Sequence, residues 1–190
     1  MTEQEILSLL QETGALLSGH FELRSGLHSD RFFQCANVLR YPRVAEKLCA
    51  ELVRRMLPHL GTARIDGVIA PALGGILVGH EVARALDVRS IFAEKQDGRL
   101  VMRRFVIRPG ERYVVAEDVI TRGGRVQETI DIVRAAGAEA LAVAVLVDRS
   151  AGAAKFDYPA FSLLHMAPQV WEPAACPLCR QGLKLMHPGS

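Results

Sequence analysis

The feature that most constrains the fold is an alternation of short apolar runs with longer amphipathic segments between residues 66 and 147. Apolar runs bounded by turn signals predict buried strands, and the longer segments predict helices. Strands that alternate with helices predict a parallel sheet covered on both faces, because each crossover helix lies over the sheet. We expect strands at residues 66–70, 89–93, 112–116 and 140–147, a hairpin return arm at 100–105, and helices at 76–86 and 125–136.

Two helices are expected before this alternation begins. Thr2 and Glu5 have the spacing of a capping box, and the short helix that they start can end at Gly14. Residues 42–59 carry apolar side chains at helical spacing along one face. Both segments are therefore predicted to pack an apolar face against the rest of the chain.

Residues 1–150 are expected to form one domain, because no linker, repeat or low-complexity tract interrupts them. Near its start, two short strands at 21–23 and 31–35 flank a polar, glycine-containing connection. Prolines and glycines then break every periodic pattern in residues 151–190. We therefore expect a loosely structured C-terminal extension, with one edge strand at 161–165.

Composition excludes several classes of protein. With 190 residues, 49% of them hydrophobic, the chain can bury a core without disulfides or a metal, so its four cysteines indicate a reducing compartment, the cytoplasm. Acidic residues at the start and the lack of an apolar run of about 18 residues argue against secretion and membrane insertion. A net charge of +2 does not by itself predict nucleic-acid binding. The excess of Arg over Lys fits phosphate or carboxylate recognition, but genome composition can also produce it.

Residues 114–125 carry the strongest functional signal, since ligands of parallel sheets bind at the carboxyl ends of the strands. The pair Gly123 and Gly124 lets backbone N–H groups approach a phosphate at a helix start, and Thr121 adds a hydroxyl. Glu117 and Asp118 would repel a bare phosphate unless they meet sugar hydroxyls or a divalent cation. The pattern predicts a sugar phosphate site with Mg²⁺; the alternative is an ordinary turn with a solvated acid pair.

This stretch has neither the Lys-Ser or Lys-Thr of a Walker loop nor the G-x-G-x-x-G of a dinucleotide site. It resembles the ribose-phosphate loop of the type I phosphoribosyltransferases. Further segments extend the resemblance, and together they are similar to the orotate phosphoribosyltransferase family: residues 21–26, Ser29 with Phe32 and Phe33, residues 71–75 and residues 147–149.

The resemblance runs from about Ile6 to Arg149 and implies both a fold and an activity. The implied fold is α/β, a type I phosphoribosyltransferase-like parallel sheet flanked by helices, with a small N-terminal hood over about residues 1–40 and an irregular C-terminal tail. The implied activity transfers the phosphoribosyl group of phosphoribosyl pyrophosphate to orotate, in pyrimidine biosynthesis. It also implies Mg²⁺ held mainly by the substrate rather than by direct protein ligands, and a homodimer with shared active sites.

The same resemblance assigns roles to residues. Catalytic roles would fall to Arg24, Lys95 and Asp118. Phosphoribosyl pyrophosphate would be bound by Ala72, Leu73, Gly74, Lys95, Glu117, Asp118, Val119, Ile120, Thr121, Arg122, Gly123, Gly124 and Arg125. Orotate would be bound by Arg24, Phe32, Phe33, Thr121 and Arg149. Without the resemblance, two adjacent Phe residues would be read as core and a lone Arg as solvated.

The chain departs from the family in its mobile catalytic loop. Family members often carry a long loop with several Lys and a His, whereas residues 92–99 turn quickly and offer only Lys95 at a matching basic position. Glu94 stands where an Arg is usual. Arg99 and the pair Arg103 and Arg104 could supply the missing charge, or could simply be the charged edge of an exposed hairpin.

Cys176 and Cys179 have the spacing of half a structural zinc site. One pair is insufficient, and a free thiol pair in a loose tail is the favoured interpretation. For a zinc site, the remaining ligands would have to come from a second chain or from Cys35, Cys49, or a His such as His165 or His187.

Two other functions share the ribose-phosphate site. One is a purine phosphoribosyltransferase, against which the segment 21–26 and the pair Asp148 and Arg149 argue. The other is a regulator that binds phosphoribosyl pyrophosphate without turnover, which the short loop and Glu94 would explain. Nucleic-acid binding through the Arg surplus would require an affinity that falls steeply with salt.

Overall fold

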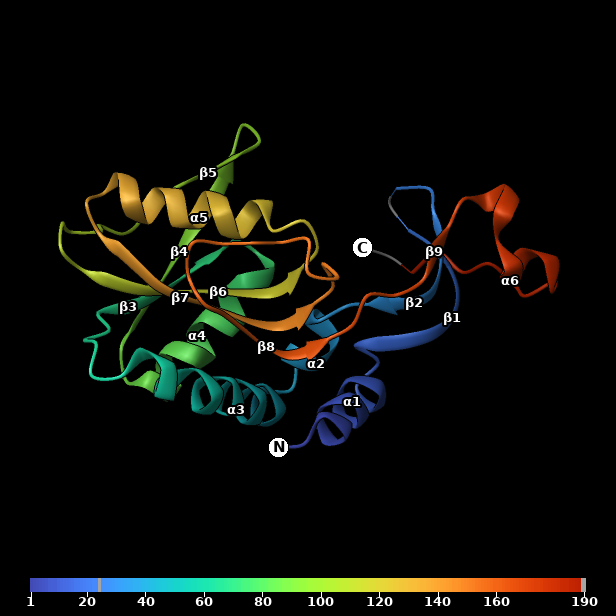
Figure 1. Ribbon diagram of the computed structural model, residues 1–190, viewed down its shortest axis with the longest axis horizontal. Coiled ribbons are helices and arrows are strands. Elements are labelled where there is room, and N and C mark those ends of the chain that lie inside the picture. Colours follow the sequence, from blue (N-terminus) through green and yellow to red (C-terminus); the bar gives the residue numbers. More distant parts are fainter. Residues whose placement is uncertain (24, 189–190) are drawn as a thin grey trace.

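A six-stranded sheet forms the body of the protein (Figure 1). The computed structural model describes residues 1–23 and 25–188. The strand order is β5-β4-β3-β6-β7-β8, and all neighbours are parallel except β4 and β5. The strands are β3 (Gly67–Pro71), β4 (Arg89–Gln96), β5 (Arg99–Val101), β6 (Arg112–Ile120), β7 (Glu139–Asp148) and β8 (Ala160–His165).

Helices cover both faces of this sheet, as the sequence predicted. Figure 1 shows α5 (Gly124–Ala135) on one face and α3 (Pro42–Leu60) with α4 (Gly74–Leu86) on the other. Successive residues of the central strand β6 point to opposite faces of the sheet. Val114 packs in the core under α3 and α4, and Val115 packs in the core under α5. Both are fully buried, which is why strands of this sheet are almost continuously apolar. Among the described residues, no helix has the length and apolarity needed to span a membrane.

Two strands differ in length from the sequence prediction. β6 continues beyond residue 116 to Ile120, because its pairing with β7 runs as far as Asp148. Glu117 and Asp118 therefore lie on the strand itself rather than in the loop that follows it. The hairpin arm β5 ends at Val101 instead of residue 105. Phe105 leaves the hairpin and packs edge-on against Phe92, with ring centroids 5.1 Å apart.

The N-terminal region consists of α1 (Glu3–Glu12), β1 (Leu16–Glu22), β2 (His28–Phe33) and α2 (Ala36–Leu39). The predicted capping box is confirmed: the Thr2 backbone N–H donates to Glu5, and the Glu5 N–H donates to the Thr2 hydroxyl at 3.2 Å. The predicted strands at 21–23 and 31–35 were placed too late along the chain. Residues 16–18 already pair with β2, and the chain from Cys35 onward turns into α2.

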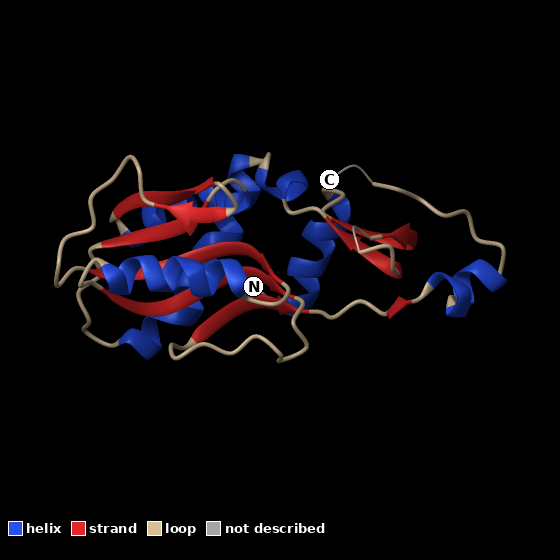
Figure 2. Ribbon diagram, turned by 90° about the horizontal axis from the view of Figure 1, so that it is seen from above, coloured by secondary structure: helices blue, strands red, loops and turns tan. Residues whose placement is uncertain are grey.

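The C-terminal extension is irregular apart from a few short elements, and the edge strand predicted at 161–165 is β8. After the edge strand β8, the chain crosses to the hood and adds β9 (Val170–Trp171) beside β2. A short 3₁₀ turn at Pro173–Ala175 and α6 (Pro177–Arg180) follow, and Met186 then pairs with Phe21 of β1. Figures 1 and 2 show this segment beside β1 and β2, beyond one end of the main sheet.

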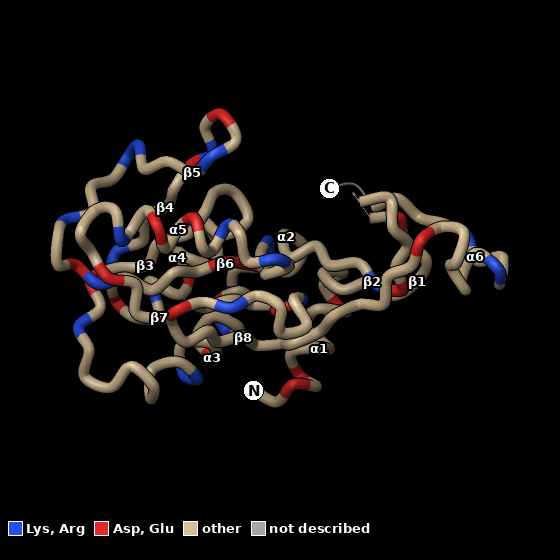
Figure 3. Tube along the Cα trace, turned by 45° about the horizontal axis from the view of Figure 1, so that its top comes forward, with Lys and Arg blue, Asp and Glu red and all other residues tan. Residues whose placement is uncertain are grey.

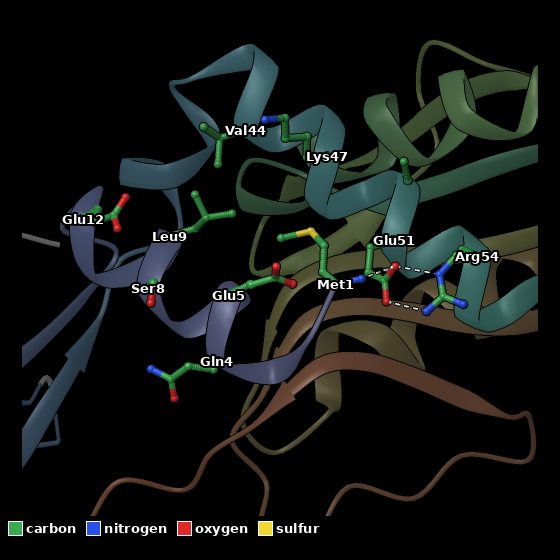
Figure 4. Close-up of a pocket in the computed structure, with 11 residues that line it drawn as sticks. Met1, Gln4, Glu5, Ser8, Leu9, Glu12, Val44, Lys47, Glu51 and Arg54 are labelled. Carbon is green, nitrogen blue, oxygen red and sulfur yellow. Dashed lines mark hydrogen bonds and ion pairs between the residues drawn. The ribbon is translucent and has the colours of Figure 1, made fainter.

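Glu51 of α3 contacts the N-terminus and two arginines of its own helix, one of which reaches β8 (Figure 4). Its buried carboxylate accepts hydrogen bonds from Arg54 at 2.7 Å and Arg55 at 2.9 Å, and it contacts the amino group of Met1 at 3.0 Å. Arg55 also donates to the carbonyl of Leu163 in β8. The groove between α1 and α3 around these residues has a volume of about 730 Å³, and it contains none of the predicted site residues.

We expect Glu51→Gln to destabilise the fold by about 1–3 kcal/mol at pH 7, since one buried charged partner is lost while its arginines keep partial access to water. The hydrogen bond from Arg54 is the largest cause that holds the pKa of Glu51 well below its usual range. The carboxylate therefore stabilises the fold above pH 4.5, the usual value, and its contribution declines as the pH falls below that value. Urea unfolding at pH 7 and in mild acid measures the difference.

Glu46→Gln is the matched control, because Glu46 is an exposed carboxylate of the same helix. Equal effects of the two substitutions at pH 7, or a Glu51→Gln effect that grows in acid, would contradict the prediction.

Candidate active site

Loops at the carboxyl ends of β3, β6 and β7 meet at one edge of the sheet. Hydrogen bonds join them: the Arg125 guanidinium donates to the carbonyl of Ala72 at 3.1 Å, and the Arg149 backbone N–H donates to the carbonyl of Ile120 at 2.8 Å. The strands are adjacent and parallel, so their ends lie side by side without long loops. The site is therefore positioned by the sheet itself.

Glu117 and Asp118 face the loop that follows β3. A Cβ atom on Gly74 would lie 2.9 Å from an Asp118 carboxylate oxygen, and one on Gly75 would lie 3.0 Å from Glu117 Oε1. A side chain at either position would therefore crowd the two carboxyl groups. The backbone N–H of Val119 donates to Asp118 Oδ1 at 2.8 Å, which holds the half-buried Asp118 side chain in place.

Glu117 carries a strongly perturbed carboxyl group. It is only 5% exposed. Burial, and then the negative charge of Asp118, raise the pKa of Glu117 to about 9, while a hydrogen bond from the Asp118 backbone N–H opposes the shift. The shift favours the protonated carboxyl, which can both donate and accept a hydrogen bond. Such a group beside the Asp118 side chain suits a ligand with adjacent hydroxyls.

The loop between β6 and α5 forms a hollow of about 270 Å³. Gly123 adopts a left-handed conformation, with φ +78°, and a Cβ there would lie 2.9 Å from the Phe156 ring. Thr121 and Arg122 are exposed at its rim, and α5 begins at Gly124. The unpaired N–H groups of the first helical turn therefore lie where an anionic ligand can reach them. The lining residues are Glu117, Val119, Ile120, Thr121, Arg122, Gly123, Gly124, Arg125 and Val126.

A second hollow of about 660 Å³ adjoins the first, because Thr121 and Arg122 line both. Arg149 and the hood residues Phe32 and Phe33 also line it. The Arg149 guanidinium lies over the ring of Phe33, 5.2 Å from its centroid. The sequence alone would have assigned Phe33 to the core, and it is indeed buried while also forming a wall of this hollow.

Arg149 is the most unusual cation of the site. Burial lowers its pKa, and within the described residues its Nε is a buried polar atom without a hydrogen-bond partner. A buried guanidinium donor that lacks an acceptor is costly, so native proteins rarely keep one without reason. The group is suited to a planar ligand that brings a carboxylate.

Lys95 lies on the β4–β5 hairpin, which carries charges of both signs (Figure 3). Its side chain is exposed and lines a hollow of about 360 Å³ together with Gly124 and Arg125 of the same chain. The hairpin is tied to α5 by the Leu100 N–H, which donates to Glu128. Arg104, which could have supplied charge to a ligand, is instead paired with Glu94 at 2.9 Å.

The structure thus brings together most of the predicted site residues, and it shows lining residues that the sequence did not reveal. Arg24 lies outside the described residues. Glu22, Leu23, Ser25, Gln34 and Pro188 were missed as lining residues of the larger hollow. The first four are close in sequence to predicted residues. Nothing in the sequence places Pro188 there, since its position depends on the return of the C-terminal segment to the hood.

Within the described part of the chain, none of the four residues that the sequence suggested as further zinc ligands joins Cys176 and Cys179. Cys176 and Cys179 lie beside His20 and His28 of the hood. Cys35 is buried near Asp118, Cys49 lies in the core under α3, His165 contacts Asp148, and His187 contacts Glu22. The sequence signal that could have identified these neighbours is the pair His20 and His28, which lie on either side of the predicted hairpin turn.

A carboxylate pair at a strand end, a glycine turn and a helix start define a phosphoribosyltransferase site on this fold. The model of the family described as "Phosphoribosyl transferase domain" matches residues 42–178. An orotate phosphoribosyltransferase from Desulforamulus reducens is 48% identical over 191 aligned residues, which cover 100% of this chain and 98% of that protein. The chain therefore belongs to the orotate phosphoribosyltransferase family.

Solved structures agree with this assignment. The crystal structure of orotate phosphoribosyltransferase from Aeropyrum pernix has a TM-score of 0.64 and 25% identity, and the alignment covers 84% of this chain and 93% of that one. An adenine phosphoribosyltransferase from Thermoanaerobacter pseudethanolicus, 17% identical, has a TM-score of 0.61 over 72% of this chain and 88% of that one. The latter shows the fold alone, so the fold does not determine which base is bound.

We expect Glu117→Gln to become increasingly stabilising, relative to the parent protein, as the pH rises from 4.5 towards 9. A native pKa of about 9 against an ordinary value of 4.5 means that the folded state keeps a proton that the unfolded state has lost. The parent protein therefore loses stability over this interval, whereas glutamine does not titrate. Urea unfolding of both proteins at several pH values measures the gap. Glu139→Gln, an exposed carboxylate on β7, is the control, and a constant gap for Glu117→Gln would refute the assignment.

Proposed function

We propose that this protein transfers the phosphoribosyl group of phosphoribosyl pyrophosphate to orotate, which yields orotidine 5′-phosphate and pyrophosphate. The observation that carries the proposal is the half-buried Arg149, whose buried Nε has no hydrogen-bond partner among the described residues, in a hollow that adjoins the proposed phosphate loop at Thr121. A base bound there would present its carboxylate to Arg149 while its ring lies near the sugar site. Orotate, unlike the purine bases, brings such a carboxylate.

The reaction depends on charge stabilisation more than on proton transfer. Its barrier is the departure of pyrophosphate from the anomeric carbon, with positive charge on the ribose and negative charge on the leaving group. Glu117 and Asp118 would bind the ribose hydroxyls, and the N–H groups of residues 121–125 would bind the 5′-phosphate. Ala72, Leu73 and Gly74 would receive the pyrophosphate. Orotate N1 can act as an anion, so no strong general base is required.

Arg149 and Thr121 would orient orotate so that N1 faces the anomeric carbon. Holding the two reactants in this geometry removes much of the entropic cost of their encounter. Phe33 supports this role, because its ring lies against the Arg149 guanidinium and limits its movement. Phe32 and Arg24 complete the proposed orotate site.

Mg²⁺ is the proposed cofactor, and the donor set fits it. Carboxylate oxygens of Asp118 and Glu117 lie against the loop that would hold pyrophosphate, and Mg²⁺ commonly combines one or two carboxylates with substrate phosphates and water. When bound with the substrate, Mg²⁺ would offset charge that develops on the leaving group. The substrate would hold it mainly, and the Asp118 carboxylate would bind it through the ribose hydroxyls or water.

A homodimer with shared active sites, located in the cytoplasm, completes the proposal. The hairpin that bears Lys95 is exposed, as a segment that reaches a partner would have to be. The reducing compartment is supported by the four cysteines, all of which are free thiols. The partners would be the two substrates and a second copy of the chain, without nucleic acid or membrane.

A non-catalytic regulator that binds phosphoribosyl pyrophosphate is the second candidate. The observation in its favour is the short hairpin, in which Glu94 engages Arg104. Such a protein would bind the substrate tightly without releasing pyrophosphate. A purine phosphoribosyltransferase would instead leave the Arg149 guanidinium without its acceptor.

Consumption of orotate, followed by its ultraviolet absorbance with Mg²⁺ and phosphoribosyl pyrophosphate, tests the proposal. Uracil, adenine, hypoxanthine and xanthine are the competing bases. We expect loss of orotate alone. Activity only with a purine would overturn the role of Arg149, and tight substrate binding with no turnover of any base would favour the regulator.

Two substitutions should show which hollow binds which substrate, because each should raise KM for one substrate only. Arg149→Ala is expected to raise KM for orotate about 100-fold, since a hydrogen-bonded charge pair is lost, with little change in KM for phosphoribosyl pyrophosphate. Asp118→Asn is expected to raise KM for phosphoribosyl pyrophosphate about tenfold or more, with little change for orotate. Steady-state kinetics with each substrate varied measures both. Equal losses for both substrates in both variants would contradict the assigned roles.

Lys95→Ala should lower kcat with milder effects on either KM, because Lys95 would act mainly on the departing pyrophosphate. If the hairpin serves the partner's site, mixing the impaired Lys95→Ala and Asp118→Asn proteins should raise the activity at low phosphoribosyl pyrophosphate to about a quarter of the parent activity, since half of the dimers are mixed and each has one intact site. The mixture is assayed after subunit exchange. No recovery in a confirmed mixed dimer would show that Lys95 acts within its own chain.

A further inference from the structure

Four side chains with metal-binding atoms meet in the hood, and none of them lines the hollows of the candidate active site. They are His20 of β1, His28 of β2, Cys176 at the start of α6 and Cys179 within α6, and their ligand atoms all lie within 4.8 Å of one another. His20, His28 and Cys176 are buried. Within the described part of the chain, no other group of three or more His, Cys, Asp or Glu residues has this arrangement.

Four of the six distances between the ligand atoms lie within about 0.4 Å of the edges of a coordination tetrahedron. Zinc bonds of about 2.0–2.1 Å to nitrogen and about 2.3 Å to sulfur imply separations of about 3.3 Å between two nitrogens and about 3.6 Å between nitrogen and sulfur. The two sulfurs lie 3.5 and 3.6 Å from His20 Nε2, and Cys179 Sγ lies 3.2 Å from His28 Nδ1. The two nitrogens are 2.9 Å apart. We propose that Cys176, Cys179, His20 and His28 bind one structural Zn²⁺ ion.

The hydrogen bond of His20 to the backbone selects the tautomer that can bind a metal through Nε2. Its Nδ1 lies 2.9 Å from the carbonyl oxygen of Leu183, which can only accept a hydrogen bond, so Nδ1 carries the proton. Nε2 therefore presents a lone pair to the cluster. A metal-bound histidine typically donates its other ring N–H to a carbonyl or carboxylate in this way.

The charge balance suits a site with little access to water. When Zn²⁺ binds, Cys176 and Cys179 each lose a thiol proton to solvent and form a bond to the metal as thiolates, while the histidines bind as neutral imidazoles. Two thiolates and one divalent cation sum to zero charge. A neutral centre avoids the cost of burying an ion among His20, His28 and Cys176.

Local backbone geometry explains why the four side chains meet. Alternate residues of a strand share a face, so His20 lies on the face of Glu22, and Glu22 pairs directly with His28. Cys176 is the N-cap of α6 and Cys179 lies within its single turn. The C-terminal segment is brought to β1 by the Met186 N–H, which donates to the carbonyl of His20 at 2.8 Å.

The hood needs such a centre because its apolar core is small. Among the described residues of β1, β2 and the segment after residue 165, the buried apolar side chains are Leu16, Phe21, Phe33 and Cys176. Leu16 and Phe33 belong to the core of the main body. Phe21 and Cys176 alone cannot offset the entropy of ordering the segment, and small units with this deficit commonly use a metal or disulfides.

Metal analysis of the full-length, tag-free protein tests the proposal. Inductively coupled plasma mass spectrometry should find one zinc per chain after dialysis. Cys176→Ala and Cys179→Ala should each reduce the zinc content to a small fraction of that value. Cys49→Ala is the matched control, because it removes a buried thiol from α3 outside the cluster, and it should retain zinc. With Co²⁺ in place of zinc, thiolate charge-transfer absorption should appear in the parent and control but not in the Cys179→Ala protein.

Limited proteolysis keeps the test independent of whether a variant folds. Arg180 and Lys184 are exposed, and trypsin should cut there about tenfold faster after the parent protein is treated with a chelator, with reversal on addition of Zn²⁺. Chelation should leave the main body folded. Absence of zinc together with failure to bind added Zn²⁺ would overturn the proposal, as would a Cys176–Cys179 disulfide in protein purified under reducing conditions. Zinc retained by the Cys179→Ala protein would also overturn the assigned ligand set.

Discussion

The burial of Glu117 beside Asp118 is the constraint around which the catalytic edge is organised. Residues 113–117 of β6 are buried, and the strand pairs with β7 as far as Ile120, which positions the two carboxyl groups. The charge of Glu117 would be costly there, so burial raises the pKa of its carboxyl group. The same two carboxyl groups explain why small residues, Gly74 and Gly75, face them, because the carboxyl oxygens occupy the space that a side chain would need.

This contact also determines how the two phosphate-binding loops are related. The loop after β3 lies against the carboxyl groups, and Arg125 at the start of α5 donates to it through Ala72. The proposed pyrophosphate and 5′-phosphate loops are therefore held on opposite sides of the proposed ribose site by strand ends and one guanidinium. Sites built on rigid elements keep their geometry better than sites on long loops. The base hollow adjoins this framework at Thr121.

The sequence predicted these parts well because they depend on local patterns. Apolar runs predicted the sheet, and the capping box predicted α1. The glycine pair after the acid pair predicted the turn into α5, where we propose that phosphate binds. The errors occur where pairing is distant in sequence: β9 joins β2 across about 140 residues, and Pro188 reaches the base hollow by the same route. No periodicity records such a contact. The histidine partners of Cys176 and Cys179 were missed for this reason too, since His20 and His28 are adjacent only in the hairpin.

The hood links the two sites that the molecule contains. Phe32 and Phe33 at one end of β2 line the base hollow, while His28 at the other end belongs to the metal cluster. The C-terminal segment has the same division: Cys176 and Cys179 lie at the cluster, and Pro188 lines the hollow. A strand of six residues is too short to bend independently at its two ends. The metal centre therefore stabilises a wall of the base hollow from a distance, which gives the C-terminal segment a role in the site.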